Sequence, residues 1–306
     1  MRKTQFATFA FIFIFSISGV LAKEVALTFD DAPNASTLHF KSSHRTSELI
    51  RKLKVSNVSS AMIFANACKG INTARTLAQL KSYRDNGHII ANHTCSHHRL
   101  DKVGFSTFSE DALKGDKLLK PLIEGERFFR FPYLNEGTDP ELRNKMRDWL
   151  KRHEYRNGII SGDNEDPTFS AKINEAKVLG KEINYDAVKE LFLEHILGSL
   201  ECNDKLAIKY LGRSPKHVLL LHEADATVMF IDSLVDKLRS RGWKIINPID
   251  AYTDDLYTET PQNTYSGFGI ISQVVFEKTG KKSVCYDYPS MLKKLNYVLG
   301  LEKKSN

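Results

Sequence analysis

The chain has 306 residues, of which 42% are hydrophobic and 26% are charged, and its formal net charge is +7. These values are ordinary for a soluble globular protein and exclude a collagen-like, coiled-coil or largely disordered chain. The basic residues are scattered along the sequence and do not form blocks, so we do not expect the protein to bind nucleic acid.

The first 22 residues have the three parts of a secretory signal peptide. Arg2 and Lys3 precede an almost unbroken apolar run at 6–21, and the small residues Val20 and Ala22 stand where a signal peptidase reads the chain. We expect cleavage after Ala22, which leaves one catalytic domain at 23–306, exported to the periplasm or the extracellular space without stable membrane insertion. The alternative is an uncleaved membrane anchor, because the apolar run is long for a signal core.

Export would place the four cysteines, Cys68, Cys95, Cys202 and Cys285, in an oxidising compartment that permits disulfide bonds. Four cysteines allow three pairings, and the sequence does not rank them. Because none of them forms a C-x-x-C pair, a thiolate zinc site is not indicated. Cys95 lies between two histidines, and we expect it to be a small packed or disulfide-bonded residue and not a metal ligand.

Short apolar runs alternate with amphipathic segments along most of the chain. The first half predicts strands at 25–29, 58–64, 88–91 and 127–131, with helices at 46–54, 73–86 and 109–122 between them. The second half predicts helices at 139–152, 171–211 and 226–241, and strands at 155–161, 217–221 and 243–246. This alternation predicts a parallel sheet covered by helices. Residues beyond about 257 show no clear pattern, and we treat them as peripheral to the chemistry.

Polar side chains occur at or just beyond the carboxyl ends of the predicted strands. They are Asp30, Asp31, His93, Arg130, Asp163 and His222. Active sites of parallel barrels and of open parallel sheets form at this edge. Each of these residues alone has an ordinary structural explanation, such as a turn, an ion pair or a core histidine. Their joint occurrence at one edge predicts an active site.

Two of the strand ends carry residue types that bind metal ions. In ANHTCSHH (91–98), His93 and His97 are four apart, which on a helical turn would place both rings on one face. In LTFDDAP (27–33), Asp30 and Asp31 are adjacent carboxylates, and burying both is costly unless a cation shares their charge. Two histidines and one aspartate would leave a metal ion with the open positions that catalysis needs.

Four motifs occur in a fixed order along the chain: LTFDD, HTCSH, RFPY and LLLH. In this order they resemble the motifs of the polysaccharide deacetylases, the NodB-homology group that forms carbohydrate esterase family 4. The resemblance extends from about Val25 to Thr253. It implies an α/β fold, the distorted (β/α) barrel of the NodB type.

The resemblance also implies a role for each matching residue. Asp30 would act as the general base, and Asp31 would bind a divalent metal ion together with His93 and His97. We expect zinc, with cobalt or another divalent ion as the alternative. Such groups suit amide hydrolysis. This reaction needs an activated water molecule, a stabilised oxyanion and a proton for the departing amine.

The remaining motifs supply the other catalytic groups. Arg130 would pair with Asp30 and keep it ionised, the backbone N–H of Tyr133 would face the developing oxyanion, and His222 would act as the general acid. A nearby carboxylate should support the protonated imidazole of His222. The candidates are Asp163 and Asp166.

Both candidates lie in the segment GDNEDP (162–167). We assign the carboxylate to Asp163, the first acid of the motif, and expect Asp163→Asn to lower activity without removing the metal ion. Relatives often have tryptophan where this chain has Pro167, which would remove one hydrophobic wall of the substrate groove.

The sequence thus predicts a metal-dependent hydrolase, acting on carbon–nitrogen bonds other than peptide bonds. It would remove N-acetyl groups from a glycan that contains N-acetylglucosamine, of the chitin oligosaccharide or peptidoglycan type, and release acetate. The alternatives are an esterase for O-acetyl groups of a polysaccharide such as xylan, a catalytically decayed glycan-binding protein, and a non-haem iron oxygenase. The last would leave His222 without an obvious role.

Overall fold

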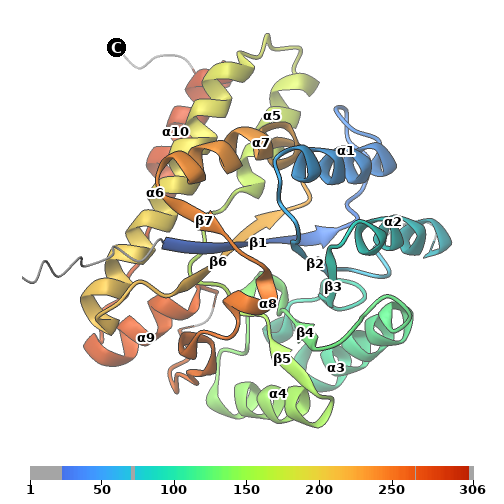
Figure 1. The fold of residues 1–306 in the computed structure, drawn as a ribbon, viewed down its shortest axis with the longest axis vertical. Helices are drawn as coiled ribbons and strands as arrows, with labels where there is room; N and C mark the ends of the chain where they lie inside the picture. Colours follow the sequence, from blue (N-terminus) through green and yellow to red (C-terminus); the bar gives the residue numbers. More distant parts are fainter. Residues whose placement is uncertain (1–22, 70–72, 266, 303–306) are drawn as a thin grey trace, which may run out of the picture.

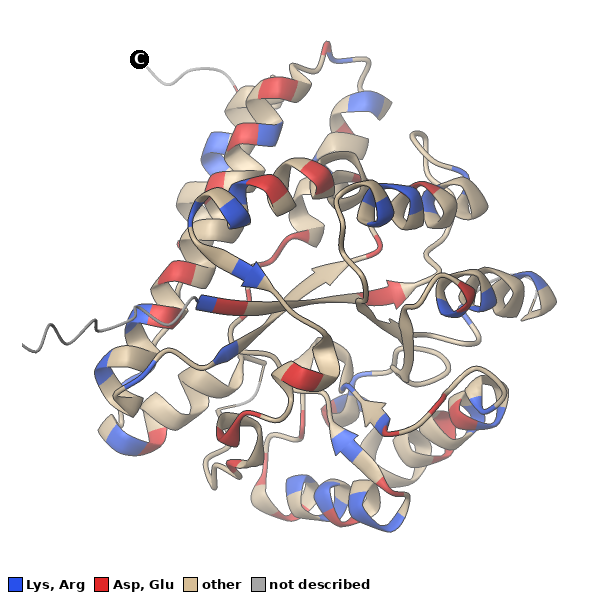
Figure 2. Cartoon of the chain, viewed as in Figure 1, with Lys and Arg blue, Asp and Glu red and all other residues tan. Residues whose placement is uncertain are grey.

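The computed structural model describes residues 23–69, 73–265 and 267–302. The predicted signal peptide at 1–22 lies outside the described residues. Within them, no helix is both long enough and apolar enough to cross a membrane. Charged residues of both signs are interspersed along the helices that surround the sheet (Figure 2).

Seven strands form one sheet in which every pairing is parallel, as the alternating pattern predicts. The order is β5-β4-β3-β2-β1-β6, and β7 pairs with the first residues of β1. The strands are β1 (Lys23–Ala32), β2 (Met62–Ala65), β3 (Ile89–Asn92), β4 (Arg127–Phe129), β5 (Tyr155–Asn157), β6 (Lys216–His222) and β7 (Trp243–Ile245).

Helices surround this sheet, with β1 running through the middle of the molecule (Figure 1). They are α1 (Ser42–Val55), α2 (Thr73–Asp85), α3 (Leu100–Leu119), α4 (Pro140–Arg152), α5 (Pro167–Val178), α6 (Tyr185–Leu211), α7 (Asp225–Ser240), α8 (Pro248–Ala251), α9 (Ile270–Thr279) and α10 (Tyr288–Val298), with short 3₁₀ turns η1 (Pro132–Leu134) and η2 (Asp255–Thr258).

The sheet curls so that the segment after β5 approaches β6. Gly162 forms an isolated parallel bridge with Leu219, and the Ser161 N–H donates to the Val218 carbonyl over 3.1 Å. The 7-stranded sheet is therefore a distorted barrel, completed between β5 and β6 by an irregular segment instead of a strand. This is the fold class expected from the sequence.

Side chains alternate between the inside and the outside of this barrel. In β1, Val25, Leu27 and Phe29 pack in the large cluster beneath α1, α5, α6 and α7, whereas Ala26 packs with Met62 and other residues in a smaller inner cluster. A strand has a period of two residues, so every second side chain of β1 faces the barrel interior.

Several predicted elements differ from those observed, including the following three. The helical region predicted at 171–211 is two helices, α5 and α6, interrupted at 179–184, where Gly180 takes a φ of 64°. The helix predicted at 109–122 begins earlier, at Leu100. The strand predicted at 155–161 ends at Asn157, because the residues after it form the closing segment.

The carboxyl-terminal residues, which the sequence analysis treats as peripheral to the chemistry, are part of the fold. A disulfide bond joins Cys202 in α6 to Cys285, and a second one joins Cys68 to Cys95. The latter agrees with the expectation for Cys95. The chain around residues 267–271 hydrogen-bonds to the closing segment at 160–161 and therefore lies at the mouth of the barrel.

Candidate active site

The alternation of side chains along the strands explains how the candidate residues reach one place. Asp30 follows Ala26 and Thr28 at intervals of two, and His222 follows Val218 and Leu220. The inner cluster also contains Phe128, two residues before Arg130, and Ala91, two residues before His93. Four motif residues are therefore in phase with the barrel interior at the carboxyl ends of their strands.

Asp31 faces the same cavity as Asp30, although consecutive residues of a strand normally face opposite sides. The pairing of β1 with β2 matches Asp30 to Phe64 and Ala32 to Ala65, so Asp31 is an extra residue, and its φ is 67°. A bulge of this kind redirects one side chain. It lets both carboxylates line the cavity.

The two histidines do not lie on a helical turn, so that part of the sequence interpretation is wrong. Residues 93–99 form an irregular loop in which Thr94 and His97 have φ values of 68° and 60°. Side chains stabilise this strained loop. Asn92 Oδ1 accepts from the Thr94 N–H at 2.8 Å, Thr94 Oγ1 accepts from the His97 N–H at 3.0 Å, and Cys95 carries the disulfide to Cys68.

Asp31, His93 and His97 could share one metal ion. Each offers a ligand atom within 4.8 Å of the others, and His97 Nε2 lies 3.3 Å from Asp31 Oδ1. That oxygen is buried and makes no hydrogen bond within the described structure, although the ammonium of Lys69 lies 3.0 Å away. His93 Nδ1 donates to the Arg130 carbonyl at 2.8 Å, which leaves Nε2 free to bind a metal.

The protonation of these three groups also suits a metal ion. Burial lowers the pKa of His93 to about 3 and that of His97 to about 4, so both imidazoles are neutral at pH 7. Burial alone would raise the pKa of Asp31, but the charges of Lys69 and His97 hold it below its usual range. Neutral imidazoles and a carboxylate are the forms that bind divalent cations.

Asp30 and Arg130 form a buried ion pair beside these ligands. Arg130 Nη1 lies 2.5 Å from Asp30 Oδ1, and the guanidinium also donates to Thr28 and to the Gly158 carbonyl at 2.9 and 2.7 Å. Burial raises the pKa of Asp30, and the charge of Arg130 limits the rise. A carboxylate whose pKa lies above its usual value is a better proton acceptor near neutral pH.

The carboxylate paired with His222 is Asp166, so the assignment of that partner to Asp163 is wrong. Asp166 Oδ1 lies 2.7 Å from His222 Nδ1, and its other oxygen accepts from the His222 N–H and the Thr227 hydroxyl, each at 2.9 Å. Burial would lower the pKa of His222, but Asp166 raises it to about 9, with smaller contributions from Asp30 and Asp31. The imidazole is therefore protonated at neutral pH.

Asp163 lies in the same cavity but makes other contacts. Its Oδ1 accepts from the backbone N–H groups of Asn164 and Glu165 at 2.7 and 3.3 Å, and Oδ2 accepts from the Tyr286 hydroxyl at 3.1 Å. Burial raises the pKa of this carboxyl. The irregular segment after β5 turns Asp166 toward β6 and Asp163 toward the carboxyl-terminal residues, and the order of acids in the motif could not show this.

One cavity of about 570 Å³ is lined by six of these residues, namely Asp30, Asp31, His93, His97, Asp163 and His222. Tyr133 is half exposed there, with its ring 4.7 Å from that of His97 and a φ of 58°. The sequence analysis missed several other lining residues, which are Lys69, Arg99, Leu134, Glu165, Leu220, Gly267 and Phe268. Pro167 also lines the cavity. Leu134, Leu220 and Glu165 were within reach of sequence analysis, because they lie in or beside the RFPY and LLLH motifs and the segment GDNEDP.

Known proteins resemble this chain in sequence and in fold. The family model "Polysaccharide deacetylase" matches residues 19–157. The chain is also 28% identical over 215 residues to a peptidoglycan-N-acetylglucosamine deacetylase from Bacillus cereus. The aligned region covers 68% of this chain and 71% of that protein. Over residues 19–157 the chain matches the polysaccharide deacetylase family, and it is a deacetylase. The resemblance carried by the four motifs is confirmed, and this deacetylase is a hydrolase.

Solved structures share the fold of this deacetylase at low sequence identity. A polysaccharide deacetylase from Bacillus cereus has a TM-score of 0.53 and 19% identity over 74% of this chain and 91% of that one. The peptidoglycan deacetylase PdaC from Bacillus subtilis has a TM-score of 0.50 and 17% identity over 76% and 91% of the two chains. Deacetylases of this family are metalloenzymes in general, in agreement with the donor set at 31, 93 and 97.

Proposed function

We propose that this deacetylase uses zinc to remove N-acetyl groups from a glycan that contains N-acetylglucosamine, of the peptidoglycan or chitin oligosaccharide type. The observation that carries the proposal is the convergence of two sets of groups in one cavity. One set is the donor triad of Asp31, His93 and His97, and the other is a proton acceptor and a proton donor, Asp30 and His222. The similarity to a peptidoglycan deacetylase supports the choice of glycan.

Zinc held by Asp31, His93 and His97 would supply Lewis acidity, which lowers the pKa of water and polarises the acetyl carbonyl. Asp30 accepts a proton from the attacking water molecule as the water oxygen forms a bond to the carbonyl carbon. Arg130 keeps Asp30 ionised and fixed in place through the ion pair of 2.5 Å. We predict that the backbone N–H of Tyr133 donates to the oxyanion, an interaction of the kind worth roughly 3 kcal/mol.

His222 then completes the reaction. Its Nδ1 is held by Asp166, so its other ring nitrogen carries the proton that the departing nitrogen needs. As the carbon–nitrogen bond breaks, this proton passes to the nitrogen, and the products are acetate and a free amine on the sugar. A pKa of about 9 for His222 keeps the proton available throughout the neutral range.

We also propose that the protein is exported. The sequence pattern of residues 1–22 supports export. The two disulfide bonds support it independently, because they use all four cysteines of the chain and such bonds persist in oxidising compartments. Peptidoglycan and chitin lie outside the cytoplasm, where an exported enzyme can reach them.

Acetate release from chitin oligosaccharides, peptidoglycan and acetylxylan tests the proposal. The purified protein is compared before chelation, after chelation, and after zinc is restored, with His97→Ala as the matched control. We expect acetate from one of the first two substrates, loss of activity with chelator and recovery with zinc. Acetate from acetylxylan alone would assign the O-acetyl esterase instead, and full activity after verified metal removal would contradict the metal dependence.

A further inference from the structure

The carboxyl-terminal segment forms part of the cavity wall, outside the alternating strands and helices. Gly267 and Phe268 line the cavity together with the catalytic groups. Phe268 is half-buried, with part of its ring exposed to the cavity. None of the steps derived above uses this residue, so its position requires a separate explanation.

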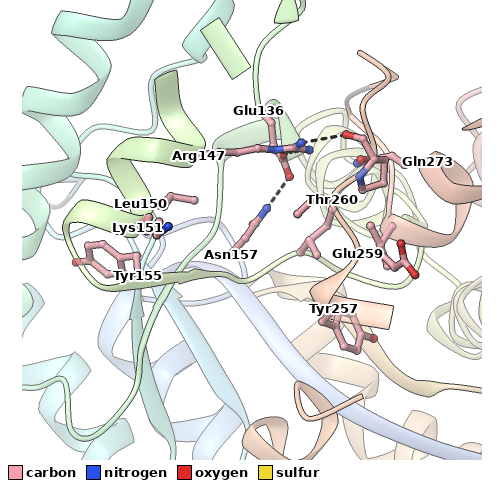
Figure 3. Close-up of a pocket in the computed structure, with 13 residues that line it drawn as sticks. Glu136, Arg147, Leu150, Lys151, Tyr155, Asn157, Tyr257, Glu259, Thr260 and Gln273 are labelled. Carbon is pink, nitrogen blue, oxygen red and sulfur yellow. Dashed lines mark hydrogen bonds and ion pairs between the residues drawn. The ribbon is translucent and has the colours of Figure 1, made fainter. Parts of the chain in front are cut away.

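The chain before Phe268 is fixed to α4 by two arginines. Arg143 donates to the Asn263 carbonyl at 3.0 Å, and Arg147 donates to the Pro261 carbonyl at the same distance. Arg147 is itself held by Glu136, which accepts from Asn157 at 2.6 Å (Figure 3). Arg147, Glu136, Asn157 and Pro261 line a second cavity of about 260 Å³. Because Arg147 pairs with Glu136 and also donates to the Pro261 carbonyl, this cavity anchors the segment.

The chain around Phe268 is fixed to the mouth of the barrel. The Gly267 N–H donates to the Leu134 carbonyl at 3.0 Å, and the Ile270 N–H donates to the Ile160 carbonyl at 2.8 Å. Between them, Gly269 lies so close to the closing segment that a Cβ there would be 2.3 Å from the Ser161 oxygen. The backbone that carries Phe268 is thus held on both sides.

The ring of Phe268 is fixed as well. It stacks on the ring of Tyr265 with 4.5 Å between centroids and 26° between planes, and Tyr265 in turn contacts Phe276. An aromatic side chain has few rotatable bonds, so a ring already packed in this way loses little conformational entropy when a ligand contacts its free face.

We propose that Phe268 is a substrate-contacting residue whose ring packs against the apolar face of a sugar ring of the glycan. This inference rests on the proposed function. A pyranose presents C–H groups on its faces, and a flat hydrophobic surface matches them. The other aromatic side chain of the cavity, Tyr133, packs against the ring of His97 and has the Arg99 guanidinium 5.7 Å from its centroid. Phe268 is therefore the aromatic surface left for the sugar.

A contact of this kind binds substrate and transition state about equally, so it lowers KM more than it raises kcat. We expect Phe268→Ala to raise KM for a glycan oligomer about 10-fold and to change kcat less than about 3-fold. A small acetyl ester, 4-nitrophenyl acetate, is too short to need this surface, so its hydrolysis should be unchanged. Phe268→Tyr keeps the ring and should retain the wild-type KM.

The experiment measures KM and kcat of these variants on the oligomer that the wild-type protein deacetylates, with Tyr297→Ala as the control. Tyr297 is also an exposed aromatic residue, but it does not line the cavity. Phe268→Leu serves as a second variant, because it keeps an apolar side chain and removes only the flat ring. Thermal unfolding shows whether each variant is folded.

An unchanged KM in folded Phe268→Leu or Phe268→Ala protein would overturn the inference. An equal loss on the oligomer and on 4-nitrophenyl acetate would also overturn it, because that result indicates a structural role in the catalytic site. If the wild-type protein releases no acetate from any glycan, the proposed function has failed, and that outcome is distinguishable because it does not depend on Phe268.

Discussion

Replacing Asp166 by asparagine separates the two acids that could support the general acid. Asp166 accepts from His222 Nδ1 at 2.7 Å, and Asp163 makes no hydrogen bond to His222 among the described residues. Asparagine has the size of aspartate and keeps one oxygen that can accept from Nδ1. The substitution therefore removes the negative charge and leaves most of the geometry.

The size of the effect follows from the pKa of His222. Burial would lower this pKa, yet the protein raises it to about 9 from an ordinary value of 6.5, and Asp166 makes the largest favourable contribution. The difference corresponds to about 3 kcal/mol in favour of the imidazolium. If the pKa of His222 returns to 6.5, the protonated fraction at pH 8 falls from about nine tenths to about one thirtieth.

The assay is the pH dependence of kcat for acetate release, for the wild-type protein and for Asp166→Asn and Asp163→Asn. Because His222 must be protonated to donate, the alkaline limb of the wild-type profile reports its pKa. We expect Asp166→Asn to move this limb to lower pH by about 2.5 units, with roughly 30-fold lower activity at pH 8 and a smaller loss near pH 6.

Asp163→Asn is the comparison variant, since it changes the other acid of the same segment, which lines the cavity and makes no described hydrogen bond to His222. We expect lower activity in this variant but an alkaline limb close to that of the wild type, and a retained metal ion in both variants. The reasoning is refuted if Asp163→Asn moves the limb and Asp166→Asn does not. Loss of the metal in Asp163→Asn would refute its placement outside the metal site.

Three further predictions follow from the same contacts. His97→Ala should lose bound zinc by elemental analysis while keeping its circular dichroism spectrum, and retained zinc would contradict its role as a ligand. Replacing Cys68 and Cys95 by serine opens a 27-residue separation, so unfolding by urea should show a loss of about 3–4 kcal/mol together with weaker zinc binding. In metal-free protein, the His222 pair should stabilise the fold by about 3 kcal/mol below pH 6.5 and lose this contribution as the pH rises through 9; Asp166→Asn should lack that dependence.

Much of the barrel could be predicted because its strands and helices have distinct hydrophobic periods. The apolar run at 217–221 and the amphipathic run at 226–241 match β6 and α7 within one or two residues. The predicted helix at 171–211 failed because amphipathic spacing continues across residues 179–184, where the break depends on Gly180 in a left-handed conformation. Periodicity does not detect a break of this kind.

The site residues that lie at strand ends could be predicted from the sequence. His93, Arg130 and His222 each lie at an interval of two from a residue of the inner cluster, so alternation could have placed them in the interior as well as at the edge. The partner of His222 was not predictable in this way. Asp163 and Asp166 lie in an irregular segment, where no period relates the position of a residue to the direction of its side chain.

The contribution of the carboxyl-terminal segment to the cavity could not be predicted, for a related reason. Phe268 belongs to no predicted element, and it reaches the cavity through backbone hydrogen bonds to 134, 160 and 161, which are distant in sequence. Arginines of α4 hold the residues before Phe268. On sequence alone, these arginines would be assigned to an exposed helix face. Contacts of this kind depend on which surfaces the finished barrel brings together, so they follow from the fold and not from local pattern.

The bulge at Asp31 links the local backbone conformation to the composition of the site. A regular strand would direct Asp30 and the next residue to opposite sides, so one strand end could supply either the proton acceptor or the metal ligand to the cavity, but not both. One extra residue with a φ of 67° brings both carboxylates into the cavity. A backbone of this kind costs of order 1–3 kcal/mol in a residue other than glycine. The ion pair of Asp31 with Lys69 offsets part of that cost. The strain is therefore located where the proposed proton acceptor and the proposed metal ligand are consecutive residues that line one cavity.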